Sequence, residues 1–187
     1  MRIATLSEML EEIVRLGEAT GMEEHAHEVR GELEGRLATV RAGVTGTEAP
    51  RVIALRRLDP PRVGGFWIPE MVSIAGGEDV AGDPGLSPPA VGWGELASLG
   101  ADVVVVMLEA GLEDAQALAM EHWESIAGLG ATRLYAVDGT AFADPGPRLV
   151  DAVELLGHIL HPDLVDPPGN VSYLALRAPV PRPASGG

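Results

Sequence analysis

The sequence contains no cysteine, which excludes disulfide bridges, thiolate metal sites and cysteine nucleophiles and leaves the redox compartment open. Basic residues are also scarce, because 13 Lys and Arg stand against 28 Asp and Glu, giving a formal net charge of −15. A surface this acidic repels phosphate backbones and anionic lipid, so we expect no nucleic acid partner. The longest strongly apolar run, residues 103–108, is too short to span a bilayer, so no membrane insertion is expected either.

Common catalytic motifs are missing as well. We find no GxSxG, Walker or HExxH motif and no GxGxxG after a strand, so we expect a protein that is not an enzyme. His25 and His27 point in different directions on a helix, and His158 with His161 fits the end of a helix better than a metal site. No metal site is expected. The first residues, MRIATLSEMLEEI, lack the features of a secretory signal, so a cytoplasmic location is expected.

The N-terminal quarter is expected to be helical. Thr5 and Glu8 form a capping box at the start of a first helix, and a second helix begins near Met22. Apolar residues recur every three or four positions along the second helix, at Met22, Ala26, Val29, Leu33, Leu37 and Val40. About twenty residues span roughly 30 Å, the width of a small domain. This helix therefore either joins two lobes or lies on a surface.

The rest of the chain alternates between strands and helices. Strands are expected at residues 51–58, 101–108 and 134–137, with an edge strand at 171–176; helices at 93–99, 113–127 and 147–161; and loops at 60–65 and 77–91. Such alternation predicts a mostly parallel sheet. The fold class is thus α/β, a three-layer sandwich preceded by a long N-terminal helical segment. Trp123 is expected in the core.

Residues 64–77, GGFWIPEMVSIAGG, hold two of the few aromatic residues, Phe66 and Trp67, between a strand and a helix. Pro69 suits the first turn of that helix, where a missing N–H costs nothing. Loops that leave strands commonly present ligand-contacting groups in α/β proteins. Two readings stay open: the rings line an open concavity at the carboxyl edge of the sheet, or they cap that edge.

Together with residues 145–151, PGPRLVD, this segment resembles the substrate-binding proteins of cobalamin and iron-siderophore ABC importers, most of all the cobalamin-binding branch. Those proteins have two α/β lobes joined by one long helix, with the ligand between the lobes, and they are usually periplasmic or on the cell surface. The resemblance covers residues 5–162 and matches the linking helix and the C-terminal lobe, whereas the N-terminal lobe has no counterpart. It implies N-terminal helices at residues 1–44, a ligand-binding lobe at 45–178 and a flexible tail at 179–187.

The resemblance implies non-catalytic binding of cobalamin, another corrinoid or an iron-siderophore, as ligand and not as cofactor. The expected pocket residues are Phe66, Trp67, Trp93, Asp138, Phe142 and Arg148. Glu70 is the expected contact with an ABC permease. Two of these assignments have alternatives: Trp93 as a core residue, and Arg148 as the partner of Asp144 or Asp151 in a structural ion pair.

Without the first lobe, the apolar stripe of the linking helix would face water. Because exposed apolar area is unfavourable, we expect a homodimer through the N-terminal helices. The alternative to ligand binding is a truncated, degenerate lobe that acts as a structural or protein-interaction module, and a small α/β enzyme is the third reading.

Overall fold

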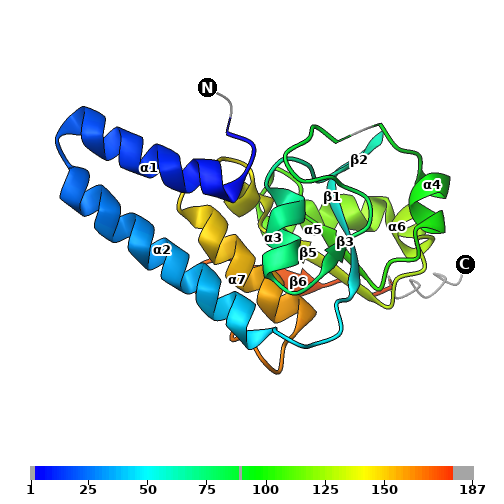
Figure 1. Ribbon diagram of the computed structural model, residues 1–187. Helices are drawn as coiled ribbons and strands as arrows, with labels where there is room; N and C mark the ends of the chain where they lie inside the picture. Colours follow the sequence, from blue (N-terminus) through cyan, green and yellow to red (C-terminus); the bar gives the residue numbers. More distant parts are fainter. Residues whose placement is uncertain (1–2, 89, 179–187) are drawn as a thin grey trace, which may run out of the picture.

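The computed structural model describes residues 3–88 and 90–178 and has two parts (Figure 1). A hairpin of two long helices, α1 (Leu6–Thr20) and α2 (Glu23–Gly43), comes first. The remaining chain forms an α/β/α sandwich, and the outer end of the hairpin extends beyond it. The expected fold class is confirmed.

Within the described ranges, the sheet has four parallel strands and two antiparallel ones at its edges. Its strands are β1 (Arg51–Leu58), β2 (Pro61–Val63), β3 (Glu78–Asp79), β4 (Val103–Val106), β5 (Arg133–Val137) and β6 (Tyr173–Ala175). Their order is β2-β1-β4-β5-β6, and β3 also pairs with β1. The strands β3, β1, β4 and β5 run parallel, whereas β2 and β6 run antiparallel to their neighbours.

Helices cover both faces of the sheet because successive side chains of each strand point to opposite sides. Val52 and Ala54 of β1 belong to one apolar cluster, and Ile53 and Leu55 to the other. The first face is covered by α3 (Ile68–Ile74) and α7 (Arg148–Leu160), with α1 and α2 packed over them. The second is covered by α4 (Trp93–Ser98), α5 (Leu112–Glu121) and α6 (Trp123–Ala127).

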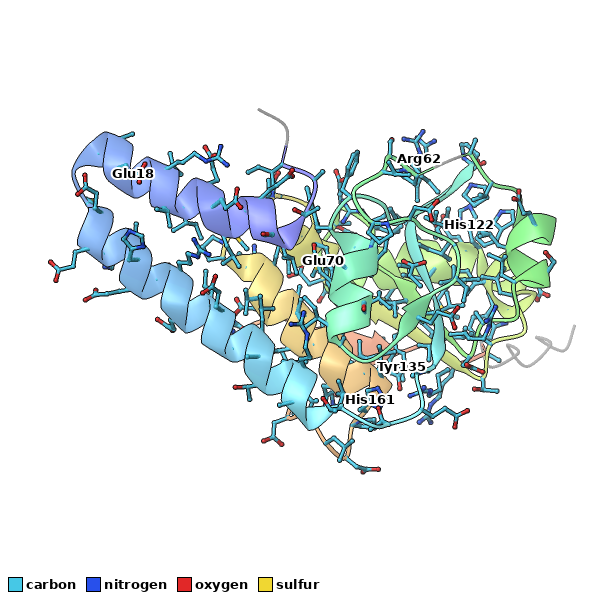
Figure 2. All side chains as sticks on the ribbon, in the orientation of Figure 1. Glu18, Arg62, Glu70, His122, Tyr135 and His161 are labelled. Atoms are coloured by element: carbon cyan, nitrogen blue, oxygen red, sulfur yellow. The ribbon has the colours of Figure 1, made fainter. Side chains whose placement is uncertain are left out.

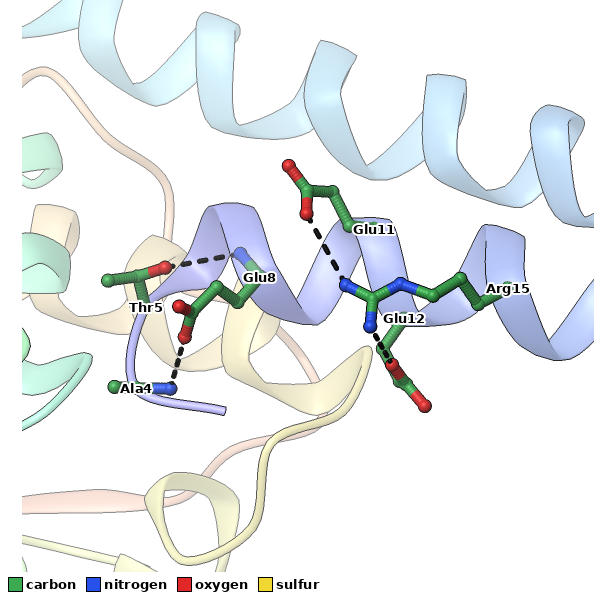
Figure 3. A network of polar contacts seen from close by, with 6 residues as sticks. All are labelled: Ala4, Thr5, Glu8, Glu11, Glu12 and Arg15. Atoms are coloured by element: carbon green, nitrogen blue, oxygen red, sulfur yellow. Dashed lines mark hydrogen bonds and ion pairs between the residues drawn. The ribbon is translucent and has the colours of Figure 1, made fainter. Parts of the chain in front are cut away.

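The start of α1 is fixed by a capping box (Figure 3). The Thr5 hydroxyl oxygen accepts the Glu8 N–H at 3.1 Å, as expected from the sequence. The Glu8 carboxylate reaches back to the Ala4 N–H at 2.6 Å, one residue earlier than in the usual motif. Further along the exposed side of α1, Arg15 pairs with Glu11 and Glu12.

The apolar stripe of α2 is covered within the chain. Ala26, Leu33, Leu37 and Val40 are all buried, because α2 packs against α1 on one side and α7 on the other. The assumption behind the expected homodimer, an unpartnered stripe, is therefore wrong. Of the stripe residues, only Met22 at the turn of the hairpin is largely exposed.

Several boundaries differ from the expected ones. The loop expected at residues 60–65 contains β2, and the loop at 77–91 contains β3. The helix expected at 113–127 is broken at His122 into α5 and α6, and Trp123 is only partly buried against the second cluster. The expected tail at 179–187 lies outside the described residues. No helix within the described ranges is long and apolar enough to cross a membrane.

Candidate functional site

A sharp change of chain direction builds the site. The hairpin of β1 and β2 leads into Gly64 and Gly65, and α3 follows directly. Phe66, between them, has φ of 55°, an unusual value for a residue with a bulky side chain. A Cβ at position 65 would lie 2.5 Å from Pro88 Cδ and 2.6 Å from the Leu86 carbonyl oxygen, so the loop before Pro88 can approach this closely only because Gly65 has no side chain.

The turn borders a pocket of about 560 Å³. β3, which follows β1 in the chain, pairs with the side of β1 away from β4, whereas β5, which follows β4, pairs with the side of β4 away from β1. The direction in which successive strands are added to the sheet therefore reverses between β1 and β4. Open α/β sheets bind ligands at the carboxyl ends of strands that flank such a reversal. The lining includes Arg56 at the end of β1 and Glu109 after β4, which places the pocket at this point.

Three arginines line the pocket, namely Arg56, Arg57 and Arg62. The chain contains no lysine, so these are three of its 13 cationic side chains. The Arg56 guanidinium donates to the Phe142 carbonyl at 3.1 Å and to Glu109 at 2.6 Å. Arg57 donates to the Pro60 carbonyl, and within the described ranges neither Arg57 nor Arg62 forms an ion pair. The pocket is therefore positively charged on an otherwise acidic molecule.

The aromatic pair forms a half-buried wall of this pocket. The ring centroids of Phe66 and Trp67 lie 6.0 Å apart, with the planes inclined by 37°. Trp67 Nε1 donates to the Phe142 carbonyl at 3.1 Å, which fixes the indole ring. Phe142 itself is fully buried in the first cluster. Phe142 therefore contributes main-chain atoms to the site, and its ring does not form an exposed wall.

The other expected pocket residues lie elsewhere. Trp93, at the start of α4, is partly buried and packs against the second cluster, outside the lining of this pocket. Asp138 caps a 3₁₀ turn, Gly139–Phe142, by accepting the Thr140 N–H, and lies beside the start of α5. Arg148 is exposed and forms no ion pair with any described residue; its expected alternative partner Asp151 pairs with Arg36.

Glu70, the expected permease contact, lies on α3 and faces α1 (Figure 2). Its carboxylate accepts the Leu6 N–H at 2.8 Å, so it satisfies one of the free N–H groups at the start of α1. This contact ties the helical hairpin to the sandwich. The role of Glu70 in docking stays a prediction.

His158 and His161 at the end of α7 have structural partners. His158 contacts the Val165 carbonyl through Nδ1 at 2.7 Å and the Tyr173 hydroxyl through Nε2 at 2.8 Å. His161 contacts the Gly76 carbonyl at 3.2 Å. Within the described ranges, no three His, Asp or Glu residues gather in a way that could hold a metal ion.

Sequence reasoning missed the polar half of the site. Arg56, Arg57, Arg62 and Glu109 line the pocket but are not among the residues expected there. The available signal was a pair of adjacent arginines, Arg56 and Arg57, near the carboxyl end of the strand that precedes GGFW, because that end is where α/β proteins bind ligands.

Comparison with known proteins gives structural similarity alone. No family model matches this sequence, and no curated protein matches it.

Solved structures do match. An ABC transporter substrate-binding protein from Listeria monocytogenes has a TM-score of 0.75 at 20% identity, over 86% of this chain and 66% of that one. A periplasmic heme-binding protein from Pseudomonas aeruginosa has a TM-score of 0.70 at 20% identity, over 94% and 63%. The periplasmic vitamin B12-binding protein BtuF of Vibrio cholerae has a TM-score of 0.70 at 21% identity, over 85% and 62%.

The chain thus spans less than two thirds of the length of each of these proteins. The neighbours are of the kind that the sequence resemblance predicted, and this chain shares the fold of ABC-transporter periplasmic binding proteins.

Proposed function

We propose that this chain binds a large, flat metal chelate or macrocycle with acidic side groups and does not transform it. It would do so as the ligand-binding lobe of a substrate-binding component related to ABC importers. The observation that carries the proposal is the pocket at the reversal point of the sheet, which combines the aromatic pair Phe66 and Trp67 with three arginines.

The two kinds of lining residue suit two parts of one ligand. Half-buried rings at a pocket mouth offer apolar surface on which a flat ligand can stack. Guanidinium groups recognise carboxylates through two parallel hydrogen bonds. Among the described residues, Arg57 and Arg62 have no acidic partner that a ligand would have to displace. At Arg56, a ligand carboxylate would replace Glu109, whose side chain is 69% exposed.

The charge of the pocket favours some ligands of the expected class over others. Porphyrins with carboxylate side chains and acidic iron-siderophores bring negative groups to the arginines, whereas the corrinoid of cobalamin carries mainly neutral amides. One structural neighbour binds vitamin B12 and another binds heme. Cobalamin therefore stays a candidate, and we rank the anionic chelates first.

The partners of the chain follow from this role. An importer component works with a permease, so we retain the permease as the proposed partner. The homodimer stays a prediction, but with less apolar surface to support it. The large apolar side chains exposed on the described part of the hairpin are Leu16 in α1, 57% exposed, and Met22 at the turn, 55% exposed. Light scattering at micromolar concentration tests the homodimer, and a monomer would refute it. The cytoplasmic location also stays a prediction.

The test is a titration of the purified chain with hemin, cyanocobalamin and a ferric carboxylate siderophore, followed by ligand absorbance and tryptophan quenching. We expect Arg62→Ser to weaken binding of the anionic ligands about 5- to 20-fold, the effect of one exposed charge-assisted contact. Arg41→Ser, at the exposed end of α2, is the matched control and should bind like the wild type. If none of the three ligands binds, the proposal fails, and the degenerate interaction module becomes the better reading.

A further inference from the structure

One wall of the pocket is a loop that contacts Phe66 through its main chain. We call residues 79–88 the strap. Near its far end, the Phe66 N–H donates to the Leu86 carbonyl at 2.8 Å, and the Gly85 N–H donates to the Phe66 carbonyl at 2.9 Å. Ser87 and Pro88, which follow directly, line the pocket. The position of the strap therefore sets the shape of the pocket beside the aromatic pair.

Asp79 holds the near end of the strap. Its Oδ1 accepts the N–H groups of Ala81 and Gly82 at 3.0 and 2.9 Å, which folds the strap back on itself. Its Oδ2 is buried and has no hydrogen-bond partner among the described residues. A negative charge on a buried carboxylate oxygen that accepts no hydrogen bond is energetically unfavourable, so burial here favours the neutral carboxyl.

Gly82, which donates its N–H to Oδ1, lies against the segment that leads into α3. Gly82 packs so tightly that a Cβ there would lie 2.5 Å from the Gly64 carbonyl oxygen, 3.1 Å from Pro69 Cγ and 3.4 Å from Asp79 Oδ2. Because Oδ2 accepts no hydrogen bond from the described residues, an ionised carboxylate lacks a donor at this buried atom. A protonated carboxyl carries less charge and can itself donate its O–H to an acceptor.

We propose that Asp79 is a protonation-controlled positioning residue for the pocket: when neutral it holds the strap against Phe66, and when ionised it loosens the strap and widens the pocket. The link from strap to ligand rests on the function proposed above. The link from Asp79 to the strap does not, so the two can be tested separately.

The charges around Asp79 support this assignment. Burial raises the pKa of the Asp79 carboxyl from 3.8 to about 6; the Ala81 and Gly82 N–H groups lower it, and the nearby Asp83 carboxylate raises it further. Charged groups on the adjoining elements have other partners, since Arg51 of β1 pairs with the neighbouring Glu78 and Glu70 of α3 binds the start of α1.

The direction of the effect follows from the raised pKa. The native state retains the proton up to about pH 6, whereas an opened strap with a solvated carboxyl loses it near 3.8. The closed strap is therefore favoured most below pH 3.8, and this contribution to closing is lost as the pH rises through about 6. Acidification tightens the strap.

Amide hydrogen exchange without any ligand tests the proposal. After correction for intrinsic exchange rates, the equilibrium constant for the opening that exposes the Gly85 N–H should increase up to about tenfold between pH 5 and pH 7.5 in the wild type. This ratio follows from the pKa of 3.8 in the open state and about 6 in the closed state. Asp79→Asn, which cannot ionise, should show no such increase. The Val105 N–H in β4 serves as the internal reference. Equal pH dependence of the Gly85 exchange in both proteins would overturn the proposal.

A second measurement covers the case in which the variant does not fold. In the wild type, NMR titration should give the same midpoint near pH 6 for the Asp79 carboxyl carbon and the Gly85 amide. A carboxyl that titrates near its ordinary value, or a Gly85 amide that does not follow it, would refute the proposal. Neither experiment uses a ligand, so failure to bind hemin or cobalamin would count against the proposed function alone.

Discussion

An ion-pair cluster joins the helical hairpin to the sandwich, beside the apolar packing of α2 on α7 and the Glu70 contact, and its contribution can be measured. Arg36 of α2 donates through Nε and Nη2 to the two carboxylate oxygens of Glu154 at 2.8 and 2.6 Å. Nη2 also donates to Asp151 at 2.5 Å. Hydrogen bonds with Glu154, and then with Asp151, raise the pKa of the Arg36 guanidinium, so it stays charged at every working pH.

The expected size of this contribution lies between two limits. Exposed ion pairs contribute about 0.2–1 kcal/mol, whereas removing one partner of a buried pair costs about 3–5 kcal/mol. Here the side chains are 32% exposed for Arg36, 13% for Asp151 and 23% for Glu154. We therefore expect Arg36→Met, which keeps most of the aliphatic stem, to lower the free energy of unfolding by about 2 kcal/mol.

A double-mutant cycle in urea separates the pair from other effects of the substitutions. With Arg36→Met, Glu154→Gln and the double variant, we expect a coupling energy of about 1–2 kcal/mol. The exposed pair Arg30–Glu34 on the same helix is the matched control, with N–O distance 2.8 Å and an expected coupling of about 0.3–0.5 kcal/mol. A coupling for Arg36 no larger than that of the control would refute the argument that partial burial strengthens this cluster.

Two further variants test single contacts. Asp79→Asn should raise the free energy of unfolding by about 3 kcal/mol at pH 7.5 and by about half as much at pH 5. The reason is that the carboxyl has a pKa of about 6 in the native state and 3.8 in the unfolded state. Urea titrations that give the same difference between variant and wild type at both pH values would contradict this. Glu70→Ala should lower stability by about 1 kcal/mol, because the Leu6 N–H at the start of α1 loses its acceptor. Glu70→Gln retains an acceptor oxygen and is the control; equal thermal midpoints for both Glu70 variants would count against this contact.

The strands and most helices were predictable from local patterns. The four valines of β4 form a continuous β-branched run, which is expected of a strand covered on both faces, and all four are fully buried. The Thr5–Glu8 capping box marked the start of α1. These signals lie within a few residues of one another, so they need no knowledge of distant contacts.

Other features depended on contacts between distant segments. Pro60 and Pro61 are typical of a loop, yet Pro61 begins a short edge strand, where a missing N–H is tolerated. The stripe of α2 was expected to need a partner outside the chain because nothing local indicates that α1 and α7 cover it. Phe142 was expected among the pocket residues, but the direction of its ring depends on the packing of α7 and the sheet, which no local pattern indicates.

The net charge of the chain and the charge of the pocket have opposite signs. A net charge of −15 disfavours an extended polyanion, since such a partner would lie against many carboxylates at once. A compact anion in the pocket meets a different field, because charges beyond the screening length of about 8 Å at physiological salt contribute little. Contacts with Arg56, Arg57 and Arg62 act at a few ångströms and outweigh that background. The acidic surface that disfavours a nucleic acid partner is therefore compatible with a pocket for the compact, negatively charged chelate proposed above.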